Sequence, residues 1–202
     1  DIKNEEMLSY KKSLRILKDT NALLEGHFVL SSGLHSDKYI QCAKLLSFPL
    51  KSNPICKSLS NKIKKKFNKI DLILSPALGG IVIGHEIGRL LNKEAIFCER
   101  VKGKFLLRRG FDIKKNSKVL IVEDVITTGK SSLECEKLIK RKGAKTIGFC
   151  CIIDRSDKKK LKIKNSKILS HIKINIPTYS AKKLPKHLKK IKAIKPGSRS
   201  IN

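Results

Sequence analysis

The segment 119–132 limits the fold of this chain more than any other, and it reads VLIVEDVITTGKSS. Its leading apolar residues are mostly β-branched, which is typical of a buried strand in a parallel sheet. Two carboxylates then end the strand, and a loop of Thr, Gly and Ser leads into a helix expected to begin near Ser131. The segment therefore predicts an α/β fold in which a strand, a polar loop and a helix follow one another directly.

This segment also has the composition of a sugar-phosphate site. Glu123 and Asp124 end the strand, where ligands bind in open α/β sheets, and adjacent carboxylates can accept hydrogen bonds from two ribose hydroxyls. Residues 127–132 supply hydroxyls, backbone N–H groups and the positive end of a helix dipole, and Gly129 lets the backbone approach a phosphate. The alternative is an ordinary strand cap and turn. A Walker phosphate loop is excluded, because no glycine precedes Gly129 at the required interval.

The rest of the chain alternates between expected strands and helices. Strands are expected at 71–75, 95–99, 118–123, 146–153 and, at a sheet edge, 168–176; helices are expected at 5–20, from Pro54 onward, at 81–91 and at 132–142. This alternation predicts a largely parallel sheet. Two short strands at 27–30 and 39–42 are expected to form a hood over the site, and 100–109 is a basic excursion.

Length and composition favour one domain, spanning 1–202, in the cytoplasm. The chain has 202 residues, 40% of them hydrophobic, which suffices for one substantial core. No apolar segment approaches the roughly 20 residues of a membrane span, and residues 1–6 are polar, unlike a targeting peptide. We therefore expect a cytoplasmic protein with no membrane partner. Six cysteines show neither a paired motif nor zinc spacing, which indicates reduced structural thiols.

The net charge of +29 makes nucleic-acid binding a first hypothesis. The lysines, however, are spread over the whole length, and a chain with three Tyr, seven Phe and no Trp is a poor platform for base stacking. Lysines at 57, 62 and 64–66 are expected to form a solvated helix face. We expect no nucleic-acid partner, and a surface charge that aids solubility and attracts polyanionic substrates.

The segment 119–132 resembles the signature with which type I phosphoribosyltransferases bind 5-phosphoribosyl 1-pyrophosphate (PRPP). Further segments are similar to orotate phosphoribosyltransferases within that family: 26–41 to their amino-terminal flap, 76–80 to their pyrophosphate loop, Asp154-Arg155 to their orotate-contacting dipeptide, and 195–199 to the ending of one bacterial branch. The resemblance spans nearly the whole chain. It implies a mainly parallel five-stranded sheet flanked by helices, with a small hood made of about residues 1–45 and part of 165–202.

The resemblance also implies a reaction. A ribose 5-phosphate group passes from PRPP to orotate, giving orotidine 5′-monophosphate and pyrophosphate in the synthesis of pyrimidine nucleotides. Mg²⁺ is the implied cofactor, held mainly by PRPP and not directly by the protein. The implied assembly is a homodimer in which the basic loop 100–110 of one subunit reaches into its neighbour's site.

Matched positions imply roles for individual residues. Arg100, Lys104 and Asp124 would serve catalysis, and Thr127 and Arg155 would bind orotate, whose carboxylate suits a bidentate guanidinium. The residues implied for PRPP are Arg100, Lys102, Glu123, Asp124, Val125, Ile126, Thr127, Thr128, Gly129, Lys130 and Ser131, with 76–80 on the pyrophosphate side. The alternative for Arg155 is a surface arginine paired with Asp154 or Asp157.

Three features depart from the family pattern. The basic loop lacks the histidine that many members carry, Ser31 stands where a lysine is often found, and Leu78-Gly79 replaces an aromatic-lysine pair. With fewer cationic side chains, the binding of PRPP is expected to rest more on backbone N–H groups, on magnesium and on the basic loop.

Three other functions compete with this interpretation. A purine-base phosphoribosyltransferase shares the PRPP signature but would not be expected to carry the flap 28–41 or Asp154-Arg155. A non-catalytic PRPP-binding regulator needs a helix-turn-helix module, for which the single helix expected before residue 26 leaves no room. A general nucleic-acid binder would show an affinity that falls steeply with salt and ignores PRPP.

Overall fold

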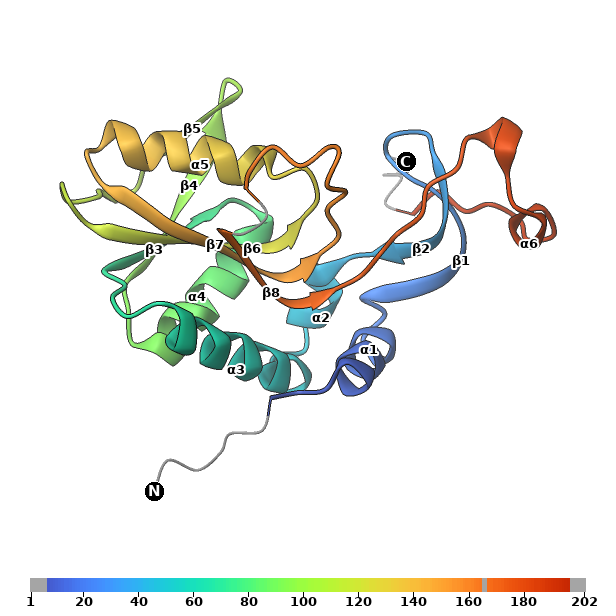
Figure 1. Ribbon diagram of the computed structural model, residues 1–202, viewed down its shortest axis with the longest axis horizontal. Helices are drawn as coiled ribbons and strands as arrows, with labels where there is room; N and C mark the ends of the chain where they lie inside the picture. Colours follow the sequence, from blue (N-terminus) through green and yellow to red (C-terminus); the bar gives the residue numbers. More distant parts are fainter. Residues whose placement is uncertain (1–6, 165–166, 197–202) are drawn as a thin grey trace.

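A computed structural model describes residues 7–164 and 167–196 (Figure 1). Its centre is a six-stranded sheet in the order β5-β4-β3-β6-β7-β8. The strands are β3 (Leu72–Pro76), β4 (Ala95–Val101), β5 (Lys104–Leu107), β6 (Lys118–Ile126), β7 (Lys145–Asp154) and β8 (Ile168–Lys173). All neighbours pair in parallel except β5, which pairs antiparallel with β4. The predicted α/β class with five parallel strands is confirmed, and β5 adds an antiparallel edge.

Helices cover both faces of this sheet. α3 (Pro49–Lys66) and α4 (Gly79–Leu91) lie on one face, and α5 (Lys130–Arg141) lies on the other (Figure 1). Successive residues of β6 are buried on opposite faces, so that Leu120 joins the core beneath α3 and α4 whereas Ile121 joins the core beneath α5. A strand covered on both faces has no solvent side, which explains the continuous apolar run in its sequence.

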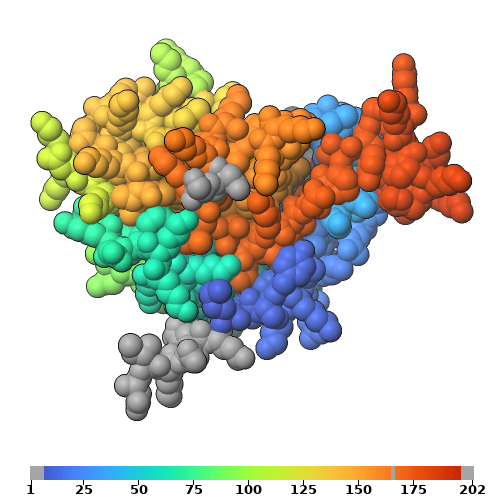
Figure 2. Space-filling model, in the orientation of Figure 1, coloured from blue at the N-terminus to red at the C-terminus, as the bar shows by residue number. Residues whose placement is uncertain are grey.

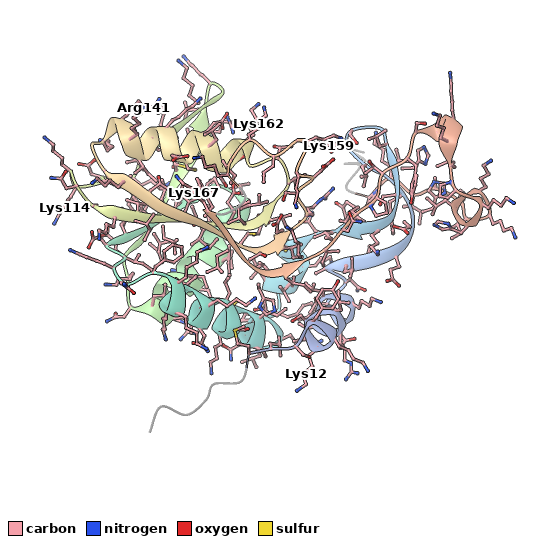
Figure 3. All side chains as sticks on the ribbon, in the orientation of Figure 1. Lys12, Lys114, Arg141, Lys159, Lys162 and Lys167 are labelled. Carbon is pink, nitrogen blue, oxygen red and sulfur yellow. The ribbon has the colours of Figure 1, made fainter. Side chains whose placement is uncertain are left out.

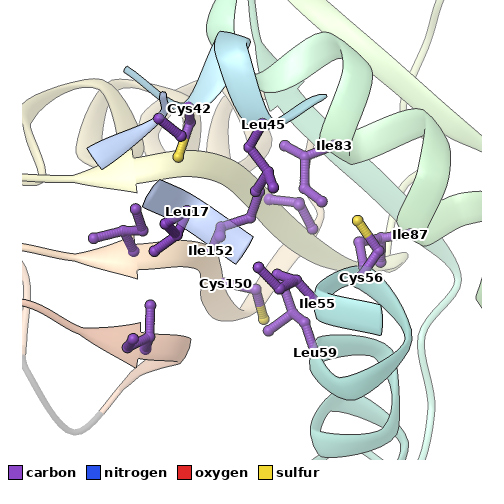
Figure 4. Close-up of a cluster of buried hydrophobic side chains, with 14 of the residues drawn as sticks. Leu17, Cys42, Leu45, Ile55, Cys56, Leu59, Ile83, Ile87, Cys150 and Ile152 are labelled. Atoms are coloured by element: carbon purple, nitrogen blue, oxygen red, sulfur yellow. The ribbon is translucent and has the colours of Figure 1, made fainter. Parts of the chain in front are cut away.

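The core between the sheet and the helices α3 and α4 is tightly packed. Figure 4 shows Ile55 of α3 and Ile83 and Ile87 of α4 within this cluster, together with Ile152 of β7. The helix α4 lies so close to β3 that a Cβ atom on Gly84 would lie 2.1 Å from the Ser75 hydroxyl oxygen. This close packing fixes the loop that enters α4, which belongs to the site described below.

A second, two-stranded sheet forms the hood: β1 (Leu23–Val29) pairs antiparallel with β2 (His35–Ile40). The helix α1 (Tyr10–Asp19) packs against it, and α2 (Cys42–Leu46) follows it. The carboxyl-terminal segment, 174–196, contains η2 (Ala181–Lys183) and α6 (Lys186–Lys189) and lies against the hood (Figures 1 and 2). Residues far apart in the sequence therefore build the hood together.

Two predicted helix starts are wrong. The helix expected from Pro54 begins at Pro49, and Pro54 lies inside α3 on an exposed position, where the Leu50 carbonyl that lacks its usual N–H partner can face water. The helix expected from residue 5 begins at Tyr10, because Ser9 caps it by accepting a hydrogen bond from the Lys12 N–H. Glu5 and Glu6 lie outside the described residues.

Several predicted strands have other bounds than expected. The strand expected at 168–176 ends at Lys173, and the one expected at 39–42 runs from His35 to Ile40, because Cys42 already belongs to α2. The strand expected at 118–123 continues to Ile126, because it stays paired with β7 as far as Asp154. The basic excursion 100–109 is in fact a hairpin of β4 and β5, closed by Lys102 and Gly103 with φ of 47° and 79°. A two-residue turn with both central φ angles positive matches the twist of a hairpin, which explains how so short a connection forms.

The basic side chains are distributed over many elements. Figure 3 labels six of them, on α1, before β6, at the end of α5 and around the segment that follows β7. Lysines 57 and 64–66 of α3 are exposed as predicted, but Lys62 is half-buried and donates hydrogen bonds of 3.2 and 2.8 Å to the carbonyls of Ser170 and His171. Lys62 therefore links α3 to β8, which corrects its assignment to a solvated face.

All six cysteines are free and buried, as expected of thiols that pack as small hydrophobic groups. Across 7–164 and 167–196, no helix combines the length and the apolar character that crossing a membrane requires.

Candidate functional site

The two acids at the end of β6 point to opposite faces of the sheet, as neighbours in a strand do. Glu123 faces α5: it is 6% exposed, and its carboxylate accepts a hydrogen bond of 2.7 Å from the Ser132 hydroxyl. Asp124 faces the loop that enters α4, and its Oδ1 accepts a hydrogen bond of 2.8 Å from the Val125 N–H. Asp124 is the more exposed of the pair.

Asp124 lies directly against the loop 76–80. A Cβ atom on Gly79 would lie 2.9 Å from Asp124 Oδ2, so a side chain at position 79 would displace the carboxylate. The Ala77–Leu78 peptide of this loop is cis, and the Ala77 N–H donates a hydrogen bond of 2.8 Å to the Cys98 carbonyl. The structure thus brings one acid of β6 together with the loop predicted for pyrophosphate.

The loop 127–129 leads into α5 as the sequence predicts, although the helix starts slightly earlier, at Lys130. Gly129 precedes it with a φ of 74°, and a Cβ atom there would lie 2.9 Å from the Ile163 side chain. The Lys162 N–H also donates a hydrogen bond of 2.7 Å to the Thr128 carbonyl. The segment after β7 therefore supports this loop from outside, and the Lys130 N–H at the start of α5 donates a hydrogen bond of 3.3 Å to the Thr128 hydroxyl.

Burial changes the acidity of both carboxyl groups. Removal from water raises the pKa of Glu123 to about 7, against the opposing effect of the Ser132 hydrogen bond. Burial also raises the pKa of Asp124, while the Val125 N–H lowers it. A raised pKa in an acid means that the folded protein keeps a proton that the unfolded chain has lost.

This shift predicts a pH-dependent stability. Between about pH 4.3, the ordinary value of a glutamate, and the value near 7, folded Glu123 binds more protons than unfolded Glu123, so the free energy of unfolding falls as the pH rises. In Glu123→Gln this loss is absent. Between about pH 5 and about pH 8, the free energy of unfolding measured in urea is expected to fall by about 2–3 kcal/mol more in the unmodified protein than in Glu123→Gln.

A buried histidine, His171, adds a pH dependence of its own to the stability of both proteins in that measurement. Burial lowers the pKa of His171 to about 4, so its own contribution to stability is lost as the pH falls below about 6.5. Because His171 is present in both proteins, its effect cancels in the difference between them. A difference that stays constant between the two pH values would contradict the placement of Glu123 as a buried, proton-binding group.

A cavity of about 620 Å³ opens between the hood and the carboxyl ends of β6 and β7. Thr127, Thr128 and Arg155 all line it, so the structure brings together the two residues predicted to bind orotate. The other lining residues are Val29, Leu30, Ser31, Ser32, Leu34, Tyr39, Gln41, Asp157, Lys160, Ile176, Thr178, Lys195 and Pro196. The hood therefore forms one wall of the cavity.

Arg155 is held in place by its backbone, whereas part of its side chain is unsatisfied. Its N–H donates a hydrogen bond of 3.0 Å to the Ile126 carbonyl, and its buried Nε has no partner among the described residues. Burial lowers the pKa of the guanidinium, and the neighbouring Tyr39 raises it. The carboxylate of Asp154 is instead engaged by the Ser156 N–H and, at 3.7 Å, by Lys173. A half-buried guanidinium whose Nε has no partner among the described residues, placed beside a cavity, is suited to an anionic ligand.

The basic hairpin lies apart from this cavity. Arg100 donates to Glu134 of α5 at 2.5 Å and to the Gly103 carbonyl at 2.8 Å, and its guanidinium covers the Phe105 ring at 4.2 Å. Lys102 and Lys104 are exposed at the tip, which projects from the body of the molecule (Figures 1 and 2). Within one chain, the structure does not bring Arg100, Lys102 or Lys104 to Thr127 and Arg155.

Two cationic residues of the cavity escaped the sequence analysis. The sequence analysis gave Lys160 no role, and it related Lys195 only to the ending of one bacterial branch. No local pattern distinguishes either from the other lysines. The contact between Ser132 and Glu123 could have been predicted in part. Side chains alternate along a strand, so Glu123 and Asp124 must face opposite sides of the sheet, and α5 covers one of them.

Comparisons with known proteins agree with this geometry. The family model for the phosphoribosyl transferase domain matches residues 50–183. The chain is 44% identical over 195 residues to an orotate phosphoribosyltransferase of Parvibaculum lavamentivorans, covering 96% of this chain and 100% of that protein. It is 45% identical to one of Sphingopyxis alaskensis, covering 90% and 92%. A crystal structure of orotate phosphoribosyltransferase from Aeropyrum pernix superimposes with a TM-score of 0.64 at 21% identity, covering 79% and 92%, and shares the fold.

Proposed function

This chain belongs to the orotate phosphoribosyltransferase family, and we propose that it transfers a ribose 5-phosphate group from PRPP to the ring nitrogen of orotate, releasing pyrophosphate. The observation that carries the proposal is the cavity beneath the hood, which Thr127, Thr128 and Arg155 line together. A guanidinium and a hydroxyl-rich loop that face one space suit a small planar acid placed beside a sugar phosphate. The product, orotidine 5′-monophosphate, is a precursor of pyrimidine nucleotides.

In the proposed reaction the protein positions its substrates and stabilises separating charge. The bond from the anomeric carbon to pyrophosphate breaks ahead of the bond that forms to the orotate nitrogen, so positive charge develops on the ribose. Pyrophosphate leaves with the electron pair of the broken bond, and the orotate nitrogen releases its proton to solvent. Asp124 would bind the ribose hydroxyls and stabilise that charge. Glu123 would hold the end of β6 in place through its hydrogen bond with Ser132 of α5. The loop 127–131 would hold the 5′-phosphate through backbone N–H groups, and Arg155 would pair with the orotate carboxylate.

Mg²⁺ is part of the proposal as a companion of PRPP. Asp124 offers the hard carboxylate oxygens that this cation prefers, and within the described ranges no three His, Cys, Asp or Glu side chains cluster as a metal site. This donor set fits a cation whose other ligands come from the substrate. When bound, it would neutralise the charge of the departing pyrophosphate.

A homodimer that shares the basic hairpin is also proposed. Two observations support it. Lys102 and Lys104 are exposed on a projecting tip, and the strands of that tip, β4 and β5, are separated from β7 by β3 and β6 in the sheet. A hairpin from a second copy could bring these lysines to the pyrophosphate side, near 76–80. The cytoplasmic location remains a prediction, consistent with six free cysteines.

The test is the consumption of orotate, followed by its ultraviolet absorbance with magnesium present and PRPP added or omitted. PRPP-dependent loss of orotate, with pyrophosphate released in equal amount, is the expected result. Adenine and guanine are offered in parallel. Activity on a purine base without activity on orotate would keep the family and overturn the substrate, and PRPP binding without turnover of any base would instead support a regulator.

A further inference from the structure

The carboxyl-terminal segment is attached to both edges of the hood hairpin. On the outer edge of β2, the backbone N–H groups of His35 and Tyr179 each donate to the other residue's carbonyl at 2.8 Å. The hydroxyl of Ser36 donates to the Pro177 carbonyl at 2.9 Å. This part of the chain therefore continues the hood sheet rather than merely covering it.

On the outer edge of β1, the same segment returns as a short parallel strand. The Ile194 N–H donates to the His27 carbonyl at 2.9 Å, and the Val29 N–H donates to the Ile194 carbonyl at 2.8 Å. A buried ring nitrogen of His27 also bonds the Ile191 carbonyl at 2.8 Å. These contacts fix the backbone on both sides of Ile194, and the next two residues, Lys195 and Pro196, line the cavity together with Val29.

We propose that Lys195 is a substrate-binding residue whose ammonium group contacts an anionic oxygen of the substrates in this cavity. The cavity holds Arg155, Lys160 and Lys195 against one acid, Asp157, so its charge favours an anion. Both substrates of the proposed function, on which this inference rests, carry such groups: orotate a carboxylate, and PRPP a 5′-phosphate. The hood wall at Ser31 and Ser32 offers hydroxyls and no charge, so Lys195 is the cation of that wall.

The test removes the positive charge of Lys195 while keeping the length of the side chain. Lys195→Met retains an apolar stem of similar reach, and Lys192→Met makes the same change at an exposed residue of the same segment that does not line the cavity. Lys195→Met is expected to raise the KM of orotate or of PRPP about tenfold, with the Tm unchanged. Lys195→Arg, which keeps the charge, is expected to stay within about threefold of the unmodified protein.

The arms of the test separate the two sources of the anion. A raised KM for orotate, with weaker binding of orotate alone by calorimetry, assigns Lys195 to the carboxylate. A raised KM for PRPP, with weaker binding of ribose 5-phosphate alone, assigns it to the phosphate. Equal KM values in Lys195→Met and Lys192→Met would overturn the inference. If the unmodified protein itself does not consume orotate, the proposed function fails first, and the binding arms still decide whether Lys195 contacts an anion.

Discussion

Asp124→Asn is expected to lower kcat/KM for PRPP by at least about 100-fold, with little change in the Tm. The amide has the shape of the carboxylate and can still accept the hydrogen bond from the Val125 N–H, and it fits beside Gly79. It lacks the negative charge that would stabilise a ribose ring turning positive. The measurement is the initial rate of orotate consumption at several PRPP concentrations, with thermal unfolding of both proteins recorded alongside.

Asp112→Asn is the matched control for this experiment. It makes the same chemical change at an exposed carboxylate paired with Lys142, on the protein surface. Its kcat/KM is expected to lie within about twofold of the unmodified value. Comparable losses in the two variants would mean that net charge, and not the position of Asp124 at the end of β6, governs the rate.

Arg155→Lys is expected to raise the KM of orotate about 30-fold to 100-fold, a loss of about 2–3 kcal/mol of binding free energy. A lysine keeps the charge but cannot form two parallel hydrogen bonds to one carboxylate. Because the buried Nε of Arg155 has no partner among the described residues, its loss is expected to leave the Tm unchanged or slightly raised. A residue kept for folding would show the reverse, a lower Tm with an unchanged KM.

Arg89→Lys provides the comparison, since Arg89 is exposed and forms a bidentate pair with Glu86 on the surface of α4. Loss of that pair removes a similar geometry without touching the cavity. Its KM for orotate is expected to match that of the unmodified protein. The PRPP KM, measured for both arginine variants, shows whether Arg155 acts on orotate alone.

The part of the site that could be predicted is carried by consecutive residues. The apolar run before Glu123 and the polar loop after Ile126 dictate a strand, a turn and a helix through local preferences alone. Thr127 and Arg155 could be predicted to meet, because they follow neighbouring parallel strands whose carboxyl ends lie at one edge of the sheet. Local sequence and sheet geometry were sufficient for these two residues.

The unpredicted parts depend on contacts between distant residues or on unusual backbone angles. Lys195 reaches the cavity only because Ile194 pairs with β1, and nothing near Lys195 in the sequence encodes that pairing. The β4–β5 hairpin depends on Lys102 adopting a positive φ, which lysine rarely does. The start of α3 was misplaced because proline signals a helix start, although Pro49 and not Pro54 occupies that position.

The attachment of the carboxyl-terminal segment to the hood has a consequence for how the chain folds during synthesis. The strands of the hood leave the ribosome early, but the backbone partner of the His27 ring is 164 positions further along. Until residues 177–179 emerge, both outer edges of this two-stranded hairpin remain unpaired, and the edge of β1 stays unpaired until Ile194 follows. An unpaired two-stranded hairpin has marginal stability and can pair with other chains. The α/β core can assemble first, so the wall that completes the cavity is among the last parts of this protein to form.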